Sequence, residues 1–209
     1  MIRRALLITD GPSDAPLGEH LEIMCAERGV EIRVTSPDLR RLPNPPSFKI
    51  EDRLRAVFDI DDAGYDLLFV HRDAEKQDPR LRHDEVRTAV SAVCHGRPYV
   101  PVVPIRMTEA WLLLDEQLIR EVAGRPDGAV PLKLPTPNQV ESLPNPKSTL
   151  QLALETASEL KGRRMRQFQN RFNENRRLLL QRLDRGGPVT GLKAWKALER
   201  SIDEALRQF

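Results

Sequence analysis

Short apolar runs alternate with longer amphipathic segments through the first 125 residues, and this alternation constrains the fold more than any other feature. The runs predict strands at 5–9, 30–35, 65–70 and 99–106. The first is a continuous apolar run, which is typical of a strand buried on both faces, and the third is the strongest strand candidate of the chain. The second run alternates between apolar and polar residues. Two prolines inside the fourth favour an edge position or a short strand with irregular ends.

The segments between these runs carry apolar residues at helical spacing, and Gly29, Gly64 and Gly96 are expected to end three of the helices. The second helix is predicted over 51–62. The apolar stripes are Leu17, Leu21, Met24 and Cys25; Leu54, Val57 and Phe58; Val86, Ala89, Val90 and Val93; and Trp111, Leu114, Leu118 and Val122. Strands that alternate with helices predict an α/β fold with a mostly parallel central sheet.

The character of the chain changes near residue 125. Residues 126–147 are rich in proline and predict a linker or wrapping loop, and the four prolines within 36–49 predict another loop. Helices are predicted over about 148–160, 163–184 and 190–207. We therefore divide the sequence into an α/β domain (1–125), a linker (126–147) and a helical C-terminal region (148–209).

Bulk composition describes an ordinary globular protein, with 40% hydrophobic and 31% charged residues and a net charge of only +2. Cys25 and Cys94 have no nearby partner cysteine or histidine pattern, so both are expected to be buried thiols in a reducing cytosol. The apolar run near the N-terminus is too short for a signal peptide or a membrane span. These features predict a cytoplasmic protein without membrane association.

Acidic residues stand where the predicted strands end. Asp10 follows the first strand, Asp73 and Glu75 follow the third, and Glu109 follows the fourth. Ligands of parallel sheets collect at the carboxyl ends of the strands. Converging carboxylates would repel one another, and Mg²⁺ (or Mn²⁺) would remove that conflict because it prefers oxygen ligands. Asp73 and Glu75 could reach one ion if the backbone stays extended beyond the strand.

Four segments resemble the Toprim-like proteins of the domain-of-unknown-function 4276 family, over roughly residues 1–155. They are Leu-Leu-Ile-Thr-Asp10-Gly11-Pro-Ser-Asp14, Leu-Leu-Phe-Val-His-Arg-Asp73-Ala-Glu75, Thr-Glu109-Ala-Trp111-Leu-Leu-Leu-Asp115 and Pro144-Asn-Pro-Lys147. In Toprim folds the first strand ends in Glu-Gly and a later strand ends in Asp-x-Asp, and these acids bind Mg²⁺ for phosphoryl transfer. The resemblance thus implies a Toprim-like sheet, with Asp10, Asp73 and Glu75 as catalytic metal ligands. Glu109 matches this family's own additional acid.

Two residues depart from the Toprim pattern, because Asp10 stands where Glu is usual and Glu75 stands where Asp is expected. Such exchanges imply either a shifted ion or weak or lost catalysis. Each acid also has a plain structural interpretation, as a turn residue (Asp10), a solvated loop (Asp73 and Glu75) or a first-turn helix acid (Glu109). His71 is a candidate proton carrier or a structural residue, and Trp111 a substrate platform or a core residue.

The segment 161–185 is strongly basic, with nine Lys or Arg residues against Glu174 and Asp184. Arginine forks onto phosphate in bidentate fashion, so this segment is a candidate nucleic-acid surface. A solvated helix with an apolar side packed on the sheet is the alternative. The candidate phosphate contacts are Lys147, Arg163, Arg164, Arg166, Arg171, Arg176 and Arg177.

Three functions follow from these features. The first is a Mg²⁺-dependent nuclease or phosphoryl-transfer protein acting on nucleic acid; the resemblance places it in bacterial defence beside an ABC-type ATPase partner. The second is a catalytically impaired module that binds nucleic acid or a partner protein. The third is an enzyme acting on a small phosphorylated molecule. The chain has no phosphate-binding loop of the Gly-x-x-x-x-Gly-Lys type, and a homodimer is compatible with its sequence.

Overall fold

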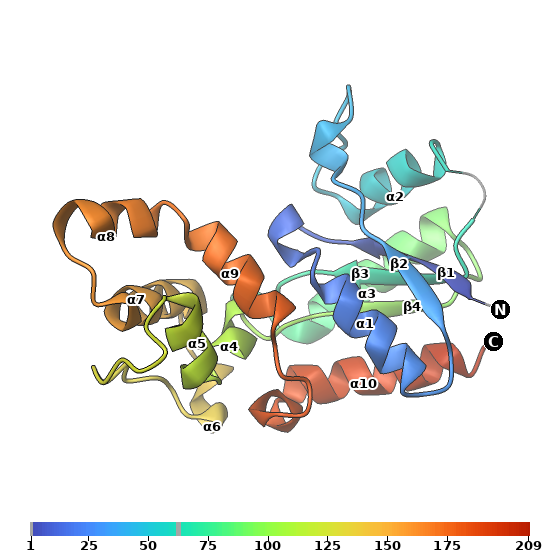
Figure 1. Ribbon diagram of the computed structural model, residues 1–209. Coiled ribbons are helices and arrows are strands. Elements are labelled where there is room, and N and C mark those ends of the chain that lie inside the picture. The colour runs from blue at the N-terminus through green and yellow to red at the C-terminus, as the bar shows by residue number, and fades with distance from the viewer. Residues whose placement is uncertain (1, 62–63) are drawn as a thin grey trace. The chain divides into compact units, whose positions relative to one another are not determined.

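The computed structural model describes residues 2–61 and 64–209 (Figure 1). The chain divides into two compact units, each built from separate stretches of sequence. Unit 1 contains Met1–Arg72, Gln77–Val103 and Lys196–Phe209. Unit 2 contains Asp73–Lys76 and Pro104–Trp195.

Unit 1 is built around a four-stranded, all-parallel sheet flanked by helices, which confirms the predicted α/β class. Its strands are β1 (Arg3–Ile8), β2 (Ile32–Thr35), β3 (Leu67–His71) and β4 (Tyr99–Val102), in the order β2-β1-β3-β4. The continuously apolar first run and the strong third run became the central strands β1 and β3. The alternating run became the edge strand β2, in which Ile32 and Val34 are more buried than the exposed Arg33 and Thr35.

The prolines of the fourth predicted strand suit its place at the other edge of the sheet. The backbone N–H of Leu68 donates to Pro98 O (3.0 Å) and that of Arg72 donates to Val102 O (3.1 Å). Alternate residues therefore face β3, and the backbone of Pro101 faces away from it. Pro101 lacks an N–H, and at this position the missing donor costs no bond in the ladder.

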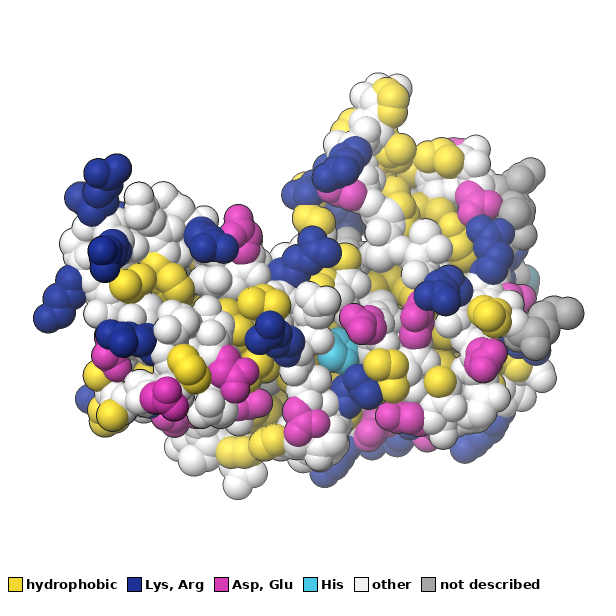
Figure 2. Space-filling view, in the orientation of Figure 1, with side chains coloured by type: hydrophobic (Ala, Val, Ile, Leu, Met, Phe, Trp, Pro, Cys, Tyr) yellow, Lys and Arg dark blue, Asp and Glu magenta, His cyan; other side chains and the backbone are white. Residues whose placement is uncertain are grey.

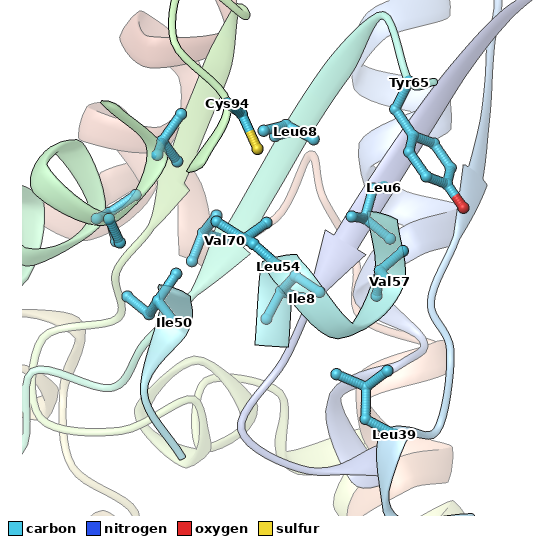
Figure 3. Close-up of a cluster of buried hydrophobic side chains, with 13 residues drawn as sticks. Leu6, Ile8, Leu39, Ile50, Leu54, Val57, Tyr65, Leu68, Val70 and Cys94 are labelled. Atoms are coloured by element: carbon cyan, nitrogen blue, oxygen red, sulfur yellow. The ribbon is translucent and has the colours of Figure 1, made fainter. Parts of the chain in front are cut away.

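Helices cover both faces of the sheet. On one face, α2 (Ile50–Phe58) and α3 (Pro79–Val93) enclose a core with the strands (Figure 3). On the other, α1 (Leu17–Ala26) packs so closely that a Cβ on Gly18 would lie 3.2 Å from Val34. The core in Figure 3 includes Leu6, Ile8, Leu54, Val57, Leu68 and Val70.

The path of the chain through the sheet defines a switch point. From β1 the chain passes over one face to β2, and it then returns over the other face to β3 and β4. The two directions diverge between β1 and β3. In doubly wound sheets the carboxyl ends of the strands at such a point form the usual ligand-binding crevice.

Unit 2 is helical. Its elements are α4 (Glu109–Leu112), α5 (Glu116–Val122), α6 (Pro137–Val140), α7 (Pro146–Ser158), α8 (Gly162–Gln169), α9 (Phe172–Gln181) and the start of α10 (Lys193–Leu206). Helices α7 and α9 pack against α4 and α5. Trp111 and Trp195 meet edge to face at 5.1 Å and are both buried, which confirms the core interpretation of Trp111.

Several helix boundaries differ from the predicted ones. The helix expected after Glu109 is split into α4 and α5, because Asp115 leaves the helical conformation and its side chain caps Leu118 N (2.9 Å). The helix predicted over 163–184 is divided into α8 and α9 around Asn170. Helix α2 ends at Phe58, and the predicted end at position 62 lies outside the described residues.

Both cysteines are buried thiols without a disulfide, as predicted. Burial raises the pKa of Cys25 to about 11, although the nearby Arg28 opposes this effect. Within the described ranges, no helix is both long enough and apolar enough to cross a bilayer.

Candidate functional site

Asp10 lies just beyond the carboxyl end of β1, at the switch point of the sheet, and its carboxylate is bound by an arginine. Arg72, the first residue after β3, donates from Nη1 to Asp10 Oδ1 at 2.5 Å. Its Nη2 donates to Glu85 Oε1 at 3.0 Å, and Glu85 lies on α3. One guanidinium therefore joins two carboxylates that come from different elements of unit 1.

The charge of Arg72 is stabilised by these two partners. Burial by itself lowers the pKa of Arg72, but the Asp10 and Glu85 carboxylates outweigh it, so the pKa is raised above its usual value. Arg72 is consequently a permanent cation. Its side chain is 17% exposed, and the two carboxylates are about twice as exposed, at 33% and 32%.

A second arginine fixes the backbone beneath Asp10. Arg53 on α2 is 6% exposed, and it donates from Nη1 to Thr9 O and from Nη2 to Asp10 O (3.3 Å). Burial lowers the pKa of Arg53, and the Asp10 carboxylate partly offsets this shift. Both the carboxylate and the peptide oxygen of Asp10 are thus held by arginines.

Asp73 belongs to unit 2, where it ties the segment after β3 to the start of α4. Its Oδ1 accepts from the backbone N–H of Thr108 (2.9 Å) and from the Thr108 hydroxyl (3.2 Å). Thr108 is fully buried, whereas Asp73 is half-buried. The Asp73 carboxylate therefore makes a structural contact with Thr108.

The backbone around Glu75 is not extended, so the condition for Asp73 and Glu75 to point the same way is not met. Glu75 has φ of 53°, in the left-handed region, and its N–H donates to the carbonyl oxygen of Arg106 at 2.6 Å. Arg106 is itself left-handed, with φ of 67°. Two such residues in contact store backbone strain, which often occurs at functional sites.

Glu109 is buried in unit 2, in an ion pair with Arg176 of α9. Arg176 Nε donates to Glu109 Oε1 at 2.8 Å, and the two side chains are only 5% and 4% exposed. Glu109 Oε2 is also buried and has no hydrogen-bond partner among the described residues. This residue is therefore more than a first-turn helix acid, because it anchors α4 to α9.

Most of the predicted basic contacts are exposed on unit 2. Arg171 pairs with Glu174 at 2.8 Å, and the Lys147 ammonium lies 6.0 Å from the ring centre of Phe172. Arg176 differs from the others because it is buried with Glu109. Figure 2 shows Lys and Arg side chains gathered over the α8 part of unit 2. The exposed predicted contacts are Lys147, Arg163, Arg164, Arg166, Arg171 and Arg177, and the exposed Lys161 and Arg182 flank α8 and α9.

In their described arrangement the predicted acids do not fit a divalent cation. Arg72 and Arg176 already neutralise Asp10 and Glu109, and Asp73 accepts two hydrogen bonds from Thr108. Among the described residues, no group of three or more His, Cys, Asp or Glu side chains is placed to hold a metal ion.

The partners of these acids were missed by sequence reasoning. The sequence could have indicated Arg72, because this residue lies between the end of a predicted strand and Asp73. Glu85 and Arg53 had no such signal in the sequence, since their roles depend on how α3 and α2 dock on the sheet. His71, the last residue of β3, is fully buried.

No family model, curated protein or solved structure matches this chain.

Proposed function

We propose that this chain is a Toprim-like protein that acts on nucleic acid and binds it through the basic residues of α8 and α9. One observation carries the proposal, namely the exposure of these side chains. Within the described part of the chain, none of the following is ion-paired: Lys161, Arg163, Arg164, Arg166, Arg177 and Arg182. Uncompensated guanidinium groups on a solvent-facing helix favour a phosphate backbone as the partner.

The geometry of α8 supports this use. None of its residues is buried, so Arg163, Arg164 and Arg166 contribute little to the packing of unit 2. Their positive charges are not needed for folding, and they repel one another. A polyanion that brings phosphates to them relieves that repulsion and releases counterions.

Salt-dependent binding tests this proposal. Replacing Arg163, Arg164 and Arg166 together by Gln should weaken binding to a DNA or RNA duplex and flatten its salt dependence. The slope of log K against log salt should fall by about 0.9 for each arginine that contacts a phosphate of duplex DNA. The matched control replaces Arg33, Arg87 and Arg200, three exposed arginines of unit 1, by Gln. Equal losses in both triple variants would contradict a specific role of α8.

Magnesium-dependent cleavage or phosphoryl transfer is a second candidate, and the strand ends favour it. Asp10 follows β1 at the switch point, and Asp73 is the second residue after β3, the neighbouring strand. The candidate metal ligands are Asp10, Asp73, Glu75 and Glu109. Since the first and last are held by arginines, a cation at either would have to displace a guanidinium. This leaves a binding module without cleavage as the simpler form of the proposal.

Cleavage assays on plasmid, linear and single-stranded DNA and on RNA, with Mg²⁺ or Mn²⁺, separate the two forms. The control is Asp73→Asn, because Asn keeps an acceptor for Thr108 but removes the charge. Metal-dependent cleavage that disappears in this variant would support the nuclease. Tight, salt-sensitive binding without cleavage would support the module, or a requirement for the ABC-type ATPase partner. No binding even at low salt would favour a small phosphorylated substrate.

A further inference from the structure

The Arg72 side chain is paired with Asp10. Its backbone N–H is part of the sheet ladder, donating to Val102 O at 3.1 Å, and its guanidinium is bound at both Nη atoms. The second partner, Glu85, is itself fixed because its Oε2 accepts from Arg82 at 2.7 Å. Arg72 therefore places a positive charge beside Asp10, at the carboxyl end of the central strands.

A guanidinium and a divalent cation cannot share this carboxylate. Mg²⁺ binds its oxygen ligands at about 2.0–2.1 Å. The Nη1 atom of Arg72 already lies 2.5 Å from Asp10 Oδ1, so an ion there would face a positive charge at close range. Removing Arg72 would instead take the bound guanidinium from the Asp10 carboxylate and leave Glu85 paired with Arg82, which favours a cation at Asp10.

We propose that Arg72 takes the place of a divalent cation at Asp10 and keeps the ion out as long as the Arg72–Asp10 pair is closed. Arg72 is a positioning residue in this role, because it acts through the carboxylate that it holds. The inference rests on the metal-dependent candidate above and not on nucleic-acid binding by α8 and α9. The inference predicts that removing the Arg72 side chain raises the affinity of the chain for a divalent cation.

The test measures Mn²⁺ binding to the full chain by calorimetry and by the electron paramagnetic resonance of free Mn²⁺. We expect Arg72→Gln to bind Mn²⁺ about tenfold more tightly than the unmodified chain, equivalent to about 1.4 kcal/mol. Adding Asp10→Asn to Arg72→Gln should abolish the gain. Arg33→Gln, which removes the same charge from an exposed position on β2, should leave Mn²⁺ affinity unchanged.

Arg72→Lys supplies a second variant if Arg72→Gln folds poorly. Lysine keeps the positive charge but lacks the forked guanidinium that joins Asp10 to Glu85. The Mn²⁺ affinity of Arg72→Lys should therefore lie between those of Arg72→Gln and the unmodified chain. Equal affinity in all Arg72 variants, with binding lost in Asp10→Asn, would overturn the inference and leave a metal site at Asp10 standing. If no variant binds Mn²⁺, the inference and the metal-dependent candidate both fail, whereas salt-dependent binding of nucleic acid would be unaffected.

Discussion

The Arg72–Asp10 pair of unit 1 and the Arg176–Glu109 pair of unit 2 have the same chemistry and very different surroundings. Both join an arginine to an acid that stands near the end of a strand in sequence. The first pair is partly solvated, with side chains 17% and 33% exposed. The second is almost completely buried, at 5% and 4%.

This difference in solvation separates an exchangeable contact from an obligatory one. Water can replace either partner of a partly exposed pair, so breaking such a pair costs little and a ligand can compete for it. A buried pair has given up its hydration, and removing one member leaves the other charge in a poorly solvating interior. We therefore expect Asp10 to be open to chemistry in a way that Glu109 is not.

The largest effect should come from Glu109→Gln, which should lower the free energy of unfolding by about 3 kcal/mol because Arg176 loses its buried counter-charge. Urea unfolding followed by circular dichroism measures the loss. Glu174→Gln is the matched control. Glu174 of α9 pairs with Arg171, the residue before this helix, and both side chains are about two-thirds exposed. A loss no greater than that of the control would show that burial does not distinguish the two pairs.

Replacing both members of the buried pair should recover most of this stability. In the double variant Glu109→Leu with Arg176→Met, neither charge is left at this buried contact and apolar side chains fill it. We expect its free energy of unfolding to lie within about 1 kcal/mol of the original chain. A double variant as unstable as Glu109→Gln would mean that the pair also makes contacts that apolar groups cannot replace.

Breaking the partly solvated Arg72–Asp10 pair should cost less. Arg72→Gln should lower the free energy of unfolding by about 1 kcal/mol or less, and the loss should shrink further in high salt because exposed charges are screened. Unfolding in low and high sodium chloride tests this dependence. If Arg72→Gln matched Glu109→Gln in cost, or if salt had no influence, the contrast between the two pairs would fail.

Glu75 offers a third case, in which the residue has a left-handed backbone conformation. Glu75→Gly should raise stability by about 0.5–1 kcal/mol, because glycine adopts the left-handed conformation without strain, less its greater entropy in the unfolded chain. Thermal unfolding measures the gain. Glu159→Gly is a useful comparison, since Glu159 also has φ of 53° at the end of α7. A loss of stability in Glu75→Gly would show that the exposed side chain contributes more than the strain costs.

The smallest expected effect is the dependence of the free energy of unfolding on pH through His83. Burial lowers the pKa of His83 on α3, although Asp84 opposes it, so protonation favours the unfolded chain. His83 should therefore contribute stability above its ordinary pKa of about 6.5 that is progressively lost as pH falls below that value. Unfolding between pH 7 and pH 5 should be less pH-dependent in His83→Gln. An unchanged pH profile would contradict this assignment.

Local sequence patterns were sufficient for the strands, for most of the helices and for the class of fold, although α6 lies in the segment predicted as a linker or loop. A buried central strand and an edge strand differ in the period of their apolar residues, so β1 and β2 could be distinguished from a few adjacent positions. The stripes of α1 and α3 and the edge position of β4 followed in the same way. Helix breaks were harder, because a single capping residue such as Asp115 outweighs a continuing apolar period.

The sequence by itself thus determined the strands, most of the helices and the acids that follow the strands. Only the tertiary structure decided the strand order and the partners of those acids. Asp10 and Arg72 are 62 residues apart, Glu109 and Arg176 are 67 apart, and Glu141 caps the start of α10 from 53 residues away. Periodicity is written in neighbouring residues, whereas an ion pair between distant segments depends on how helices and strands dock, and no local pattern records that.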